Sequence, residues 1–235
     1  RFPRPCYGVE CSTHAASPFV WHIPRYSWSI QSAQWFAFPG EPLRPLLTIA
    51  TGNPTKVAEI EAMLSPLDLD VCRQPDDLDV EETGETYLEN AQLKASAAAL
   101  RTRRWAIADD SGLEIDALGG APGLFSARYA NGNASKIERI LSELGPTPYR
   151  SACFRSTMVI SDPHGHCVAS AEGVCWGELL TKPAYPGGCY ESLLWVREAR
   201  CAYGELNHSQ LLRLGSRGKA ARALAPDLRR LLLLT

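Results

Sequence analysis

The sequence predicts a mixed α/β fold of a single domain, in which strand-like and helical segments alternate. Short apolar runs at residues 46–50 and 105–108 are typical of buried strands, and apolar residues spaced three and four apart follow the first run, as on one face of a helix. With 235 residues, of which 45% are hydrophobic, the chain can bury one substantial core. No internal repeat or low-complexity linker divides it, so one domain is the simplest expectation.

Residues 1–45 differ from the rest of the chain. They hold several prolines and three of the six tryptophans, without a sustained apolar period of 2 or 3.6. We therefore expect a poorly ordered N-terminal extension at 1–45 and a folded domain at 46–235. The aromatic content of the extension leaves a partner-binding arm as the alternative.

The first predicted strand, Leu46–Ala50, runs into a short loop and then a helix. Asn53 suits the N-cap and Pro54 the first helical position, and apolar residues recur at helical spacing as far as Leu64. Free backbone N–H groups at a helix N-terminus, a threonine hydroxyl and Lys56 make a suitable anion site. The candidate phosphate-binding residues are Thr51, Gly52, Asn53, Pro54, Thr55 and Lys56. The spacing of a Walker A loop is absent, and a plain capped helix explains the segment equally well.

A second helix is predicted to follow the acidic residues Glu81 and Glu82. One of its faces is apolar and is formed by Tyr87, Ala91, Ala95 and Ala98. Asn90 and Lys94 lie four residues apart on a neighbouring face, so they can point the same way. Acidic residues followed by this pair could hold a metal and a phosphate together. Compensation of the helix dipole explains the glutamates as well, but it does not explain Lys94.

The run Ala108-Asp109-Asp110-Ser111-Gly112 places two adjacent carboxylates where an apolar segment is expected to enter a Ser-Gly turn. Two such carboxylates repel each other unless a cation lies beside them. Mg²⁺ suits this position, because it is held by one or two carboxylates together with water and phosphate oxygens. A solvated turn is the alternative, since Asp, Ser and Gly are ordinary turn residues.

The C-terminal half adds a helix and a β-hairpin. Apolar residues from Ile137 to Leu144 recur at helical spacing, and Gly145 with Pro146 ends this helix. Strand-like runs at 153–161 and 167–176 flank the Asp-Pro-His-Gly segment at 162–165, which indicates an antiparallel hairpin. His164 and its neighbours have metal-ligand residue types, but we interpret them as the hairpin tip.

Two further helices are expected near the C-terminus. Asn207-His208-Ser209-Gln210 has the form of a capping box that opens a short helix. A Gly-Ser-Arg-Gly loop is then expected at 215–218, followed by a closing helix at 221–231 whose leucines pack on the sheet.

The loop at 51–56, the acidic segment and helix at 81–95 and the double acid at 109–110 occur in an order that resembles the Ham1 or inosine triphosphatase family. The segment Gly-Gly-Ala-Pro-Gly-Leu-Phe-Ser-Ala-Arg-Tyr at 119–129 is similar to a family motif nearly letter for letter, and Ser-Arg-Gly-Lys-Ala at 216–220 continues the match. The resemblance covers residues 46–235. It implies an elongated mixed β-sheet flanked by helices, two lobes with the active-site cleft between them, and a homodimer.

The resemblance also implies a reaction: Mg²⁺-dependent hydrolysis of ITP, dITP or XTP to the nucleoside monophosphate and pyrophosphate. The loop at 51–56 and Lys94 would hold the triphosphate, and Ser111 would contact the substrate. Asp110 would activate the water and bind the metal, with Glu81 as its preferred carboxylate partner and Asp109 or Glu82 in support. The remaining substrate-binding residues are Tyr190, Glu191, Ser216 and Arg217.

The chain departs from the family pattern around the base pocket. Gly188 stands where members carry a phenylalanine that stacks on the base, Ser216 stands for the usual histidine, and Leu211 for the usual lysine. Tyr190 or Trp195 could supply the stacking surface, and Arg217 remains to donate to a 6-oxo group. A nucleotide-binding sensor without turnover, or a hydrolase of another phosphate compound, is therefore kept as an alternative.

Composition favours a cytoplasmic enzyme acting on a small molecule. The net charge of −2 gives no global basic field for nucleic acid, and no apolar run is long enough to cross a bilayer. The eight cysteines include no Cys-x-x-Cys pair and follow no secretory signal, so we expect reduced thiols.

Overall fold

The computed structural model describes residues 44–233 of the chain. The chain divides into two units, Arg1–Glu41 and Pro42–Thr235, and everything below concerns the second. The extension predicted at 1–45 lies outside the described residues, apart from Arg44 and Pro45. Within the second unit the predicted α/β class is confirmed, because a mixed seven-stranded sheet is flanked by helices.

The sheet has the strand order β2-β1-β3-β4-β5-β6-β7. The strands are β1 (Leu46–Ile49), β2 (Asp70–Arg73), β3 (Trp105–Ile115), β4 (Ser151–Ser161), β5 (Cys167–Leu179), β6 (Leu194–Val196) and β7 (Cys201–Ala202). The helices are α1 (Pro54–Leu64), α2 (Tyr87–Thr102), α3 (Asn133–Leu144), α4 (His208–Leu214) and α5 (Ser216–Leu232). Strand β1 runs parallel to β2 and β3, whereas the pairs from β3 to β7 are antiparallel.

Strand β1 is shorter than β3, so part of one edge of β3 has no neighbouring strand among residues 44–233. Strand β1 pairs with β3 only as far as Ile49 opposite Ile107. The other edge of β3 pairs with β4 from Ala106 to Ile115. Beyond Ile107, then, no described strand lies on the β1 side of β3. Residues 110–113 of β3 line a cleft there together with residues from the start of α1.

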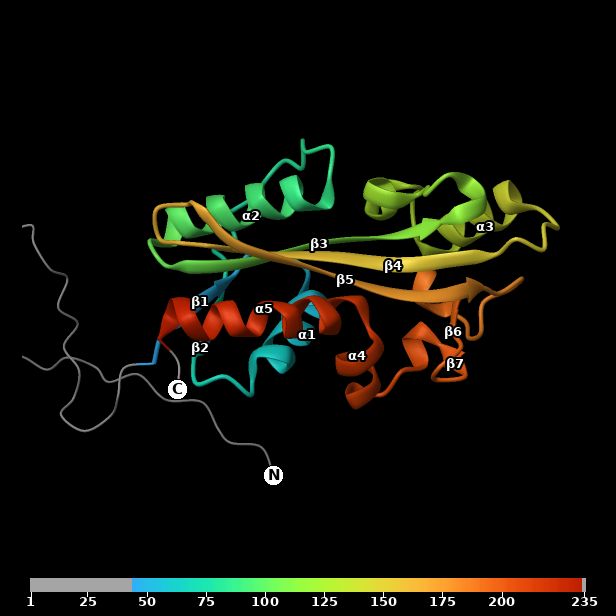
Figure 1. Ribbon diagram of the computed structural model, residues 1–235. Coiled ribbons are helices and arrows are strands. Elements are labelled where there is room, and N and C mark those ends of the chain that lie inside the picture. The colour runs from blue at the N-terminus through green and yellow to red at the C-terminus, as the bar shows by residue number, and fades with distance from the viewer. Residues whose placement is uncertain (1–43, 234–235) are drawn as a thin grey trace, which may run out of the picture. The chain divides into compact units, whose positions relative to one another are not determined.

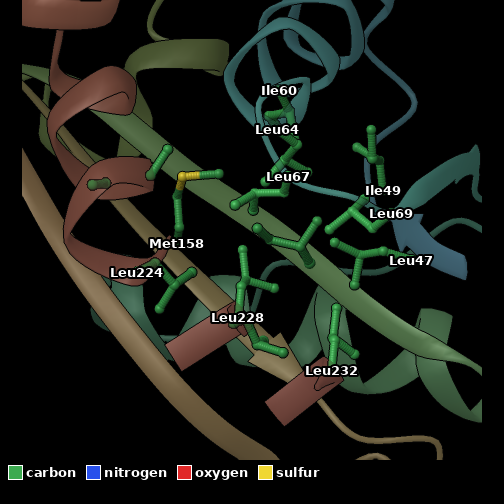
Figure 2. Close-up of a cluster of buried hydrophobic side chains, with 14 of the residues drawn as sticks. Leu47, Ile49, Ile60, Leu64, Leu67, Leu69, Met158, Leu224, Leu228 and Leu232 are labelled. Atoms are coloured by element: carbon green, nitrogen blue, oxygen red, sulfur yellow. The ribbon is translucent and has the colours of Figure 1, made fainter. Parts of the chain in front are cut away.

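Helices cover both faces of the sheet, with α2 and α3 on one face and α1 and α5 on the other (Figure 1). Leucine and isoleucine side chains from β1, α1 and α5 meet Met158 of β4 in one apolar cluster, shown in Figure 2. On the opposite face the small residues of α2, including Ala91, Ala95 and Ala98, pack against Ala106 and Ala108 of β3. Ile107 lies between these two alanines in sequence but on the α1 and α5 side, as the period of two requires.

A second set of apolar clusters lies at the other end of the long strands. Leu113 and Ile115 of β3 pack there with Ile137 and Ile140 of α3. The residues between the two groups on β3, Asp109–Gly112, are mostly polar. The long strands therefore connect two lobes within this unit, as the family resemblance implies.

Several local predictions are confirmed. Asn53 caps α1 through its side chain, with Thr55 N donating to Asn53 Oδ1 at 2.9 Å, and Pro54 opens the helix. Strands β4 and β5 form the predicted antiparallel hairpin, and the Asn207 side chain makes the predicted capping box of α4.

The six described cysteines form no disulfide. The described part of the chain contains no helix that is both long enough and apolar enough to span a membrane.

Two predicted turns are wrong. Strand β3 does not end at the double acid, because Asp109, Asp110, Ser111 and Gly112 all pair with β4. The predicted loop at 215–218 is the first turn of α5, which begins at Ser216 directly after Gly215. The glycines in both segments allow close packing: a Cβ on Gly112 would lie 2.8 Å from Ser126 Oγ, and one on Gly218 would contact the Leu212 carbonyl oxygen.

Candidate active site

A cleft of about 700 Å³ lies along the open edge of β3. Its walls come from the start of α1, from β3 and β4, from segments near residues 124–136, 185–191 and 203–204, and from the junction of α4 and α5. Nine of the predicted site residues line it, namely Asn53, Thr55, Lys56, Asp110, Ser111, Tyr190, Glu191, Ser216 and Arg217. The structure thus brings together residues that are up to 164 positions apart (53 to 217).

The other predicted residues lie elsewhere. Thr51, Gly52 and Pro54 line an adjacent cavity of about 560 Å³ on the β2 side of the same loop. Lys94 reaches the cleft only through its ion pairs, described below. Glu81 is exposed and does not line the cleft, whereas its neighbour Glu82 does. Trp195 lies in β6, where it pairs with Glu178 of β5, and it does not line the cleft.

Asp109 is fully buried and is neutralised by two cations. Its Oδ2 atom lies 2.8 Å from Lys56 Nζ and accepts a hydrogen bond from Arg217 Nε at 3.0 Å. Burial alone would raise the pKa of this carboxyl, but the Arg217 and Lys56 charges outweigh it and hold the pKa well below its usual range. Asp109 Oδ1 is buried without a hydrogen-bond partner among the described residues.

Asp110 points to the opposite face of the sheet, because successive strand residues alternate. Its Oδ1 atom accepts a hydrogen bond from Lys94 Nζ of α2 at 3.0 Å, and Lys94 also donates to Glu82 Oε1 at 2.8 Å. Burial raises the pKa of Asp110 despite the nearby Lys94, and the Glu82 charge raises it further. For Glu82, by contrast, Lys94 overcomes burial, and the pKa is lowered.

The two adjacent carboxylates therefore avoid repulsion differently from the sequence expectation. We expected one cation to serve both, at a turn. Instead, the pleat of the strand directs the two carboxylates to opposite faces of the sheet. Asp109 pairs with Lys56 of α1 and Arg217 of α5, and Asp110 pairs with Lys94 of α2.

Arg217 is largely committed to protein partners. Besides Asp109, its guanidinium donates to Glu59 Oε2 and to Ser111 Oγ, the latter at 2.9 Å. Ser216 Oγ lies 2.8 Å from Ser156 Oγ in a buried contact with β4. The role of Arg217 as a donor to the base stays a prediction.

Aromatic residues also line the cleft, among them Tyr190. Tyr190 is buried, and its hydroxyl donates to the Ser126 carbonyl oxygen at 3.1 Å. Glu191 Oε1 accepts from the Cys189 backbone N–H at 2.7 Å, so its carboxylate shapes the turn at 188–192. Sequence reasoning missed several lining residues: Glu59, Phe154, Tyr185 and Tyr203. The glutamate looked like an ordinary polar position of a helix, and the three aromatics lie outside the recognised motifs.

Glu82 and Asp110 are the carboxylates suited to a divalent cation. Both line the cleft, and their shared contact with Lys94 holds them close together. Mg²⁺ needs only one or two protein carboxylates when phosphate oxygens complete its shell. Among residues 44–233, no group of three or more His, Cys, Asp or Glu could hold a metal. This donor set fits an ion bound jointly with a phosphate substrate, and it favours Glu82 over the predicted Glu81.

Lys94 is expected to limit how far burial raises the pKa of Asp110. Replacing it by methionine (Lys94→Met) removes the adjacent positive charge and should raise that pKa further, so that Asp110 stays protonated to a higher pH. Carboxyl ¹³C NMR titration of Asp110 in the wild type, Lys94→Met and Lys94→Arg tests this. The arginine variant serves as the charge-conserving control, and an equal or lower pKa in Lys94→Met would contradict the assigned electrostatics.

The sheet and the cleft, with its buried ion pairs, are those of an α/β enzyme. Residues 47–227 match the family described as the Ham1 family. The chain belongs to the Ham1 family.

Relatives and solved structures agree with this assignment. The chain is 43% identical over 188 residues to the dITP/XTP pyrophosphatase of Synechococcus sp. (strain CC9311), which covers 80% of this chain and 91% of that protein. It is 42% identical to the dITP/XTP pyrophosphatase of Nostoc sp. (strain PCC 7120), covering 78% and 94%. The Ham1 protein structure from Staphylococcus aureus superimposes with a TM-score of 0.69 at 33% identity, covering 79% of this chain and 98% of that one. The predictions of family, fold and hydrolase class are confirmed.

Proposed function

We propose that the protein hydrolyses inosine, deoxyinosine and xanthosine triphosphates to the monophosphate and pyrophosphate, with Mg²⁺ as cofactor. The observation that carries the proposal is one cleft that is lined both by a helix N-terminus with Lys56 and by the carboxylates Glu82 and Asp110. The relatives named dITP/XTP pyrophosphatase support the choice of substrate. As the family resemblance implies, the proposal includes a homodimer in the cytoplasm that acts on free nucleotides and not on nucleic acid.

The start of α1 is the proposed phosphate-binding element. The start of α1 carries the positive end of the helix dipole. Its first-turn N–H groups are already used, because those of Thr55 and Lys56 donate to the Asn53 side chain and Pro54 has none, so the Lys56 ammonium is the donor that this helix start offers. Lys56 is already fixed by Asp109 at 2.8 Å, so its ammonium needs little reorganisation to meet a phosphate oxygen. Lys56→Ala should therefore act mainly on substrate binding.

Asp110 is the proposed general base. It takes a proton from a water molecule whose oxygen forms the new bond to the α-phosphorus. The bond from the α-phosphorus to the bridging oxygen breaks, and pyrophosphate leaves with that oxygen. Lys94 orients the Asp110 carboxylate through the contact at 3.0 Å, and its charge opposes the effect of burial, which raises the pKa of Asp110.

Glu82 and Asp110 would hold Mg²⁺ together with phosphate oxygens. When bound, the ion neutralises negative charge on the phosphates. The chain's own contribution is to keep both carboxylates at one side of the cleft through Lys94.

The base preference provides a direct test of the proposed substrate. A 6-oxo group accepts a hydrogen bond, whereas the 6-amino group of adenine leaves a buried donor unpaired, which costs about 1 to 3 kcal/mol. We expect kcat/KM for ITP and XTP to exceed that for ATP, by a smaller margin than in members with the complete base motif. Kinetics with ITP, XTP, GTP and ATP measure the margin, and equal values for ITP and ATP would refute the 6-oxo preference.

Two alternatives remain, a sensor that binds nucleotides without turnover and a hydrolase of another phosphate compound. Pyrophosphate release from a panel of nucleotides with Mg²⁺ separates them. Rapid release from ITP supports the proposal. Binding without release indicates the sensor, and release of phosphate only from other esters or anhydrides indicates the second alternative.

A further inference from the structure

Tyr185 lines the cleft and packs closely against two glycines, Gly188 and Gly204. A Cβ atom on Gly188 would lie 2.7 Å from Tyr185 Cε2, and one on Gly204 would lie 2.9 Å from Tyr185 Cζ and closer still to its hydroxyl. Contacts this short do not occur with a real Cβ, so the ring can occupy this place only because both positions are glycine.

The other aromatics near the cleft are engaged elsewhere. Tyr190 is buried and hydrogen-bonded to the Ser126 carbonyl oxygen. Phe154 and Tyr203 pack on each other, with ring centroids 4.6 Å apart, and both pack against apolar clusters. Tyr185 is half-buried, lines the cleft, and belongs to none of the apolar clusters among the described residues.

We propose that Tyr185 is the surface on which the purine base stacks in this cleft, in place of the aromatic residue missing at Gly188. This inference rests on the proposed function. Gly188 packs against the Cε2 edge of the ring and Gly204 against its hydroxyl end, and the ring lines the cleft. A planar base gains from stacking on an aromatic ring whatever its exocyclic groups are, because every base has a π-face.

The hydroxyl of Tyr185 lies among acidic groups. Burial and the charges of Glu191 and Glu205 all raise the pKa of Tyr185. The phenol therefore stays neutral and adds no negative charge beside the base. Stacking on this ring tolerates different bases, so Tyr185 supplies affinity for a base, and selectivity between bases comes from other contacts.

The test compares a ligand that has a base with one that lacks it. Inosine monophosphate and ribose 5-phosphate are titrated into wild type, Tyr185→Ala and Tyr185→Phe, with Tyr149→Ala as the matched control, since Tyr149 is 76% exposed and lies outside the cleft. Tyr185→Ala should weaken inosine monophosphate binding by about tenfold and leave ribose 5-phosphate binding unchanged. Tyr185→Phe and Tyr149→Ala should match the wild type. Equal losses for both ligands, no loss for inosine monophosphate, or no binding of it by the wild type would overturn the inference.

A second variant moves the ring without removing it. Gly204→Ala forces the Tyr185 hydroxyl and the Glu191 side chain to shift and should also weaken inosine monophosphate binding. The part of this loss that acts through Tyr185 should vanish in the Tyr185→Ala background. The same loss in both backgrounds would show that Gly204 acts independently of Tyr185. The proposed function fails separately, if the wild type releases no pyrophosphate from ITP, because binding of the monophosphate does not require turnover.

Discussion

Asp110→Asn should lower kcat for ITP by about 10² to 10⁴ and leave the fold intact, because an amide cannot accept the proton from the attacking water. Lys94 keeps its second partner, Glu82 at 2.8 Å, so the variant does not leave a buried cation alone. Initial rates of pyrophosphate release at saturating Mg²⁺ measure the effect, with thermal unfolding as the check on the fold.

Asp116→Asn is the matched control for this variant. Asp116 follows β3 directly, is exposed, and does not line the cleft. It should keep wild-type turnover. Near-full activity of Asp110→Asn would show that another group is the base.

Arg217→Met should cost about 3 to 5 kcal/mol of the free energy of unfolding, the usual effect of removing one partner from a buried ion pair. Asp109 is 0% exposed and would keep only Lys56, and Glu59 would lose its cation as well. Urea unfolding of the wild type and the variant at neutral pH measures the difference. Arg230→Met is the control, because the Arg230 side chain is 68% exposed and its pair with Asp227 should contribute at most about 1 kcal/mol.

The pH dependence of this stability follows from the direction of the Asp109 pKa. The folded-state pKa lies below the unfolded value, so the stabilisation is present above the unfolded pKa of about 3.9 and is lost as the pH falls through the folded value. Without Arg217 the folded pKa rises toward the unfolded value, so the acid-induced loss should be smaller and should be complete at a higher pH. A difference in stability below 1 kcal/mol at neutral pH would contradict the assigned ion pair.

Local patterns in the sequence were sufficient to predict the elements that depend on residues nearby in the chain. The Asn53 cap, the hairpin tip at Asp162 and the capping box at Asn207 are all set by residues within a few positions. The strand through Asp109 and Asp110 was missed because cross-strand pairing with β4, about fifty residues away, outweighs the turn preference of Asp, Ser and Gly.

The ion pairs of the site could not be predicted from the sequence for the same reason. Arg217 meets Asp109 across 108 positions and Glu59 across 158, and no local pattern encodes such contacts. The sequence could not decide whether Glu81 or Glu82 lies at the metal site. Two adjacent acidic residues in an irregular segment differ only in the direction in which the backbone points their side chains. The structure places Glu82 beside Lys94.

The order in which the site residues are synthesised has a consequence for the nascent chain. Residues made first fold first, and the strand that carries Asp109 and Asp110 leaves the ribosome long before α5. Until α5 docks, Asp109 lacks its guanidinium and the cleft lacks the wall formed by Ser216 and Arg217. We therefore expect that a nascent chain cannot hydrolyse a nucleotide until α5 has docked, so that catalysis begins only when synthesis of this domain is nearly complete.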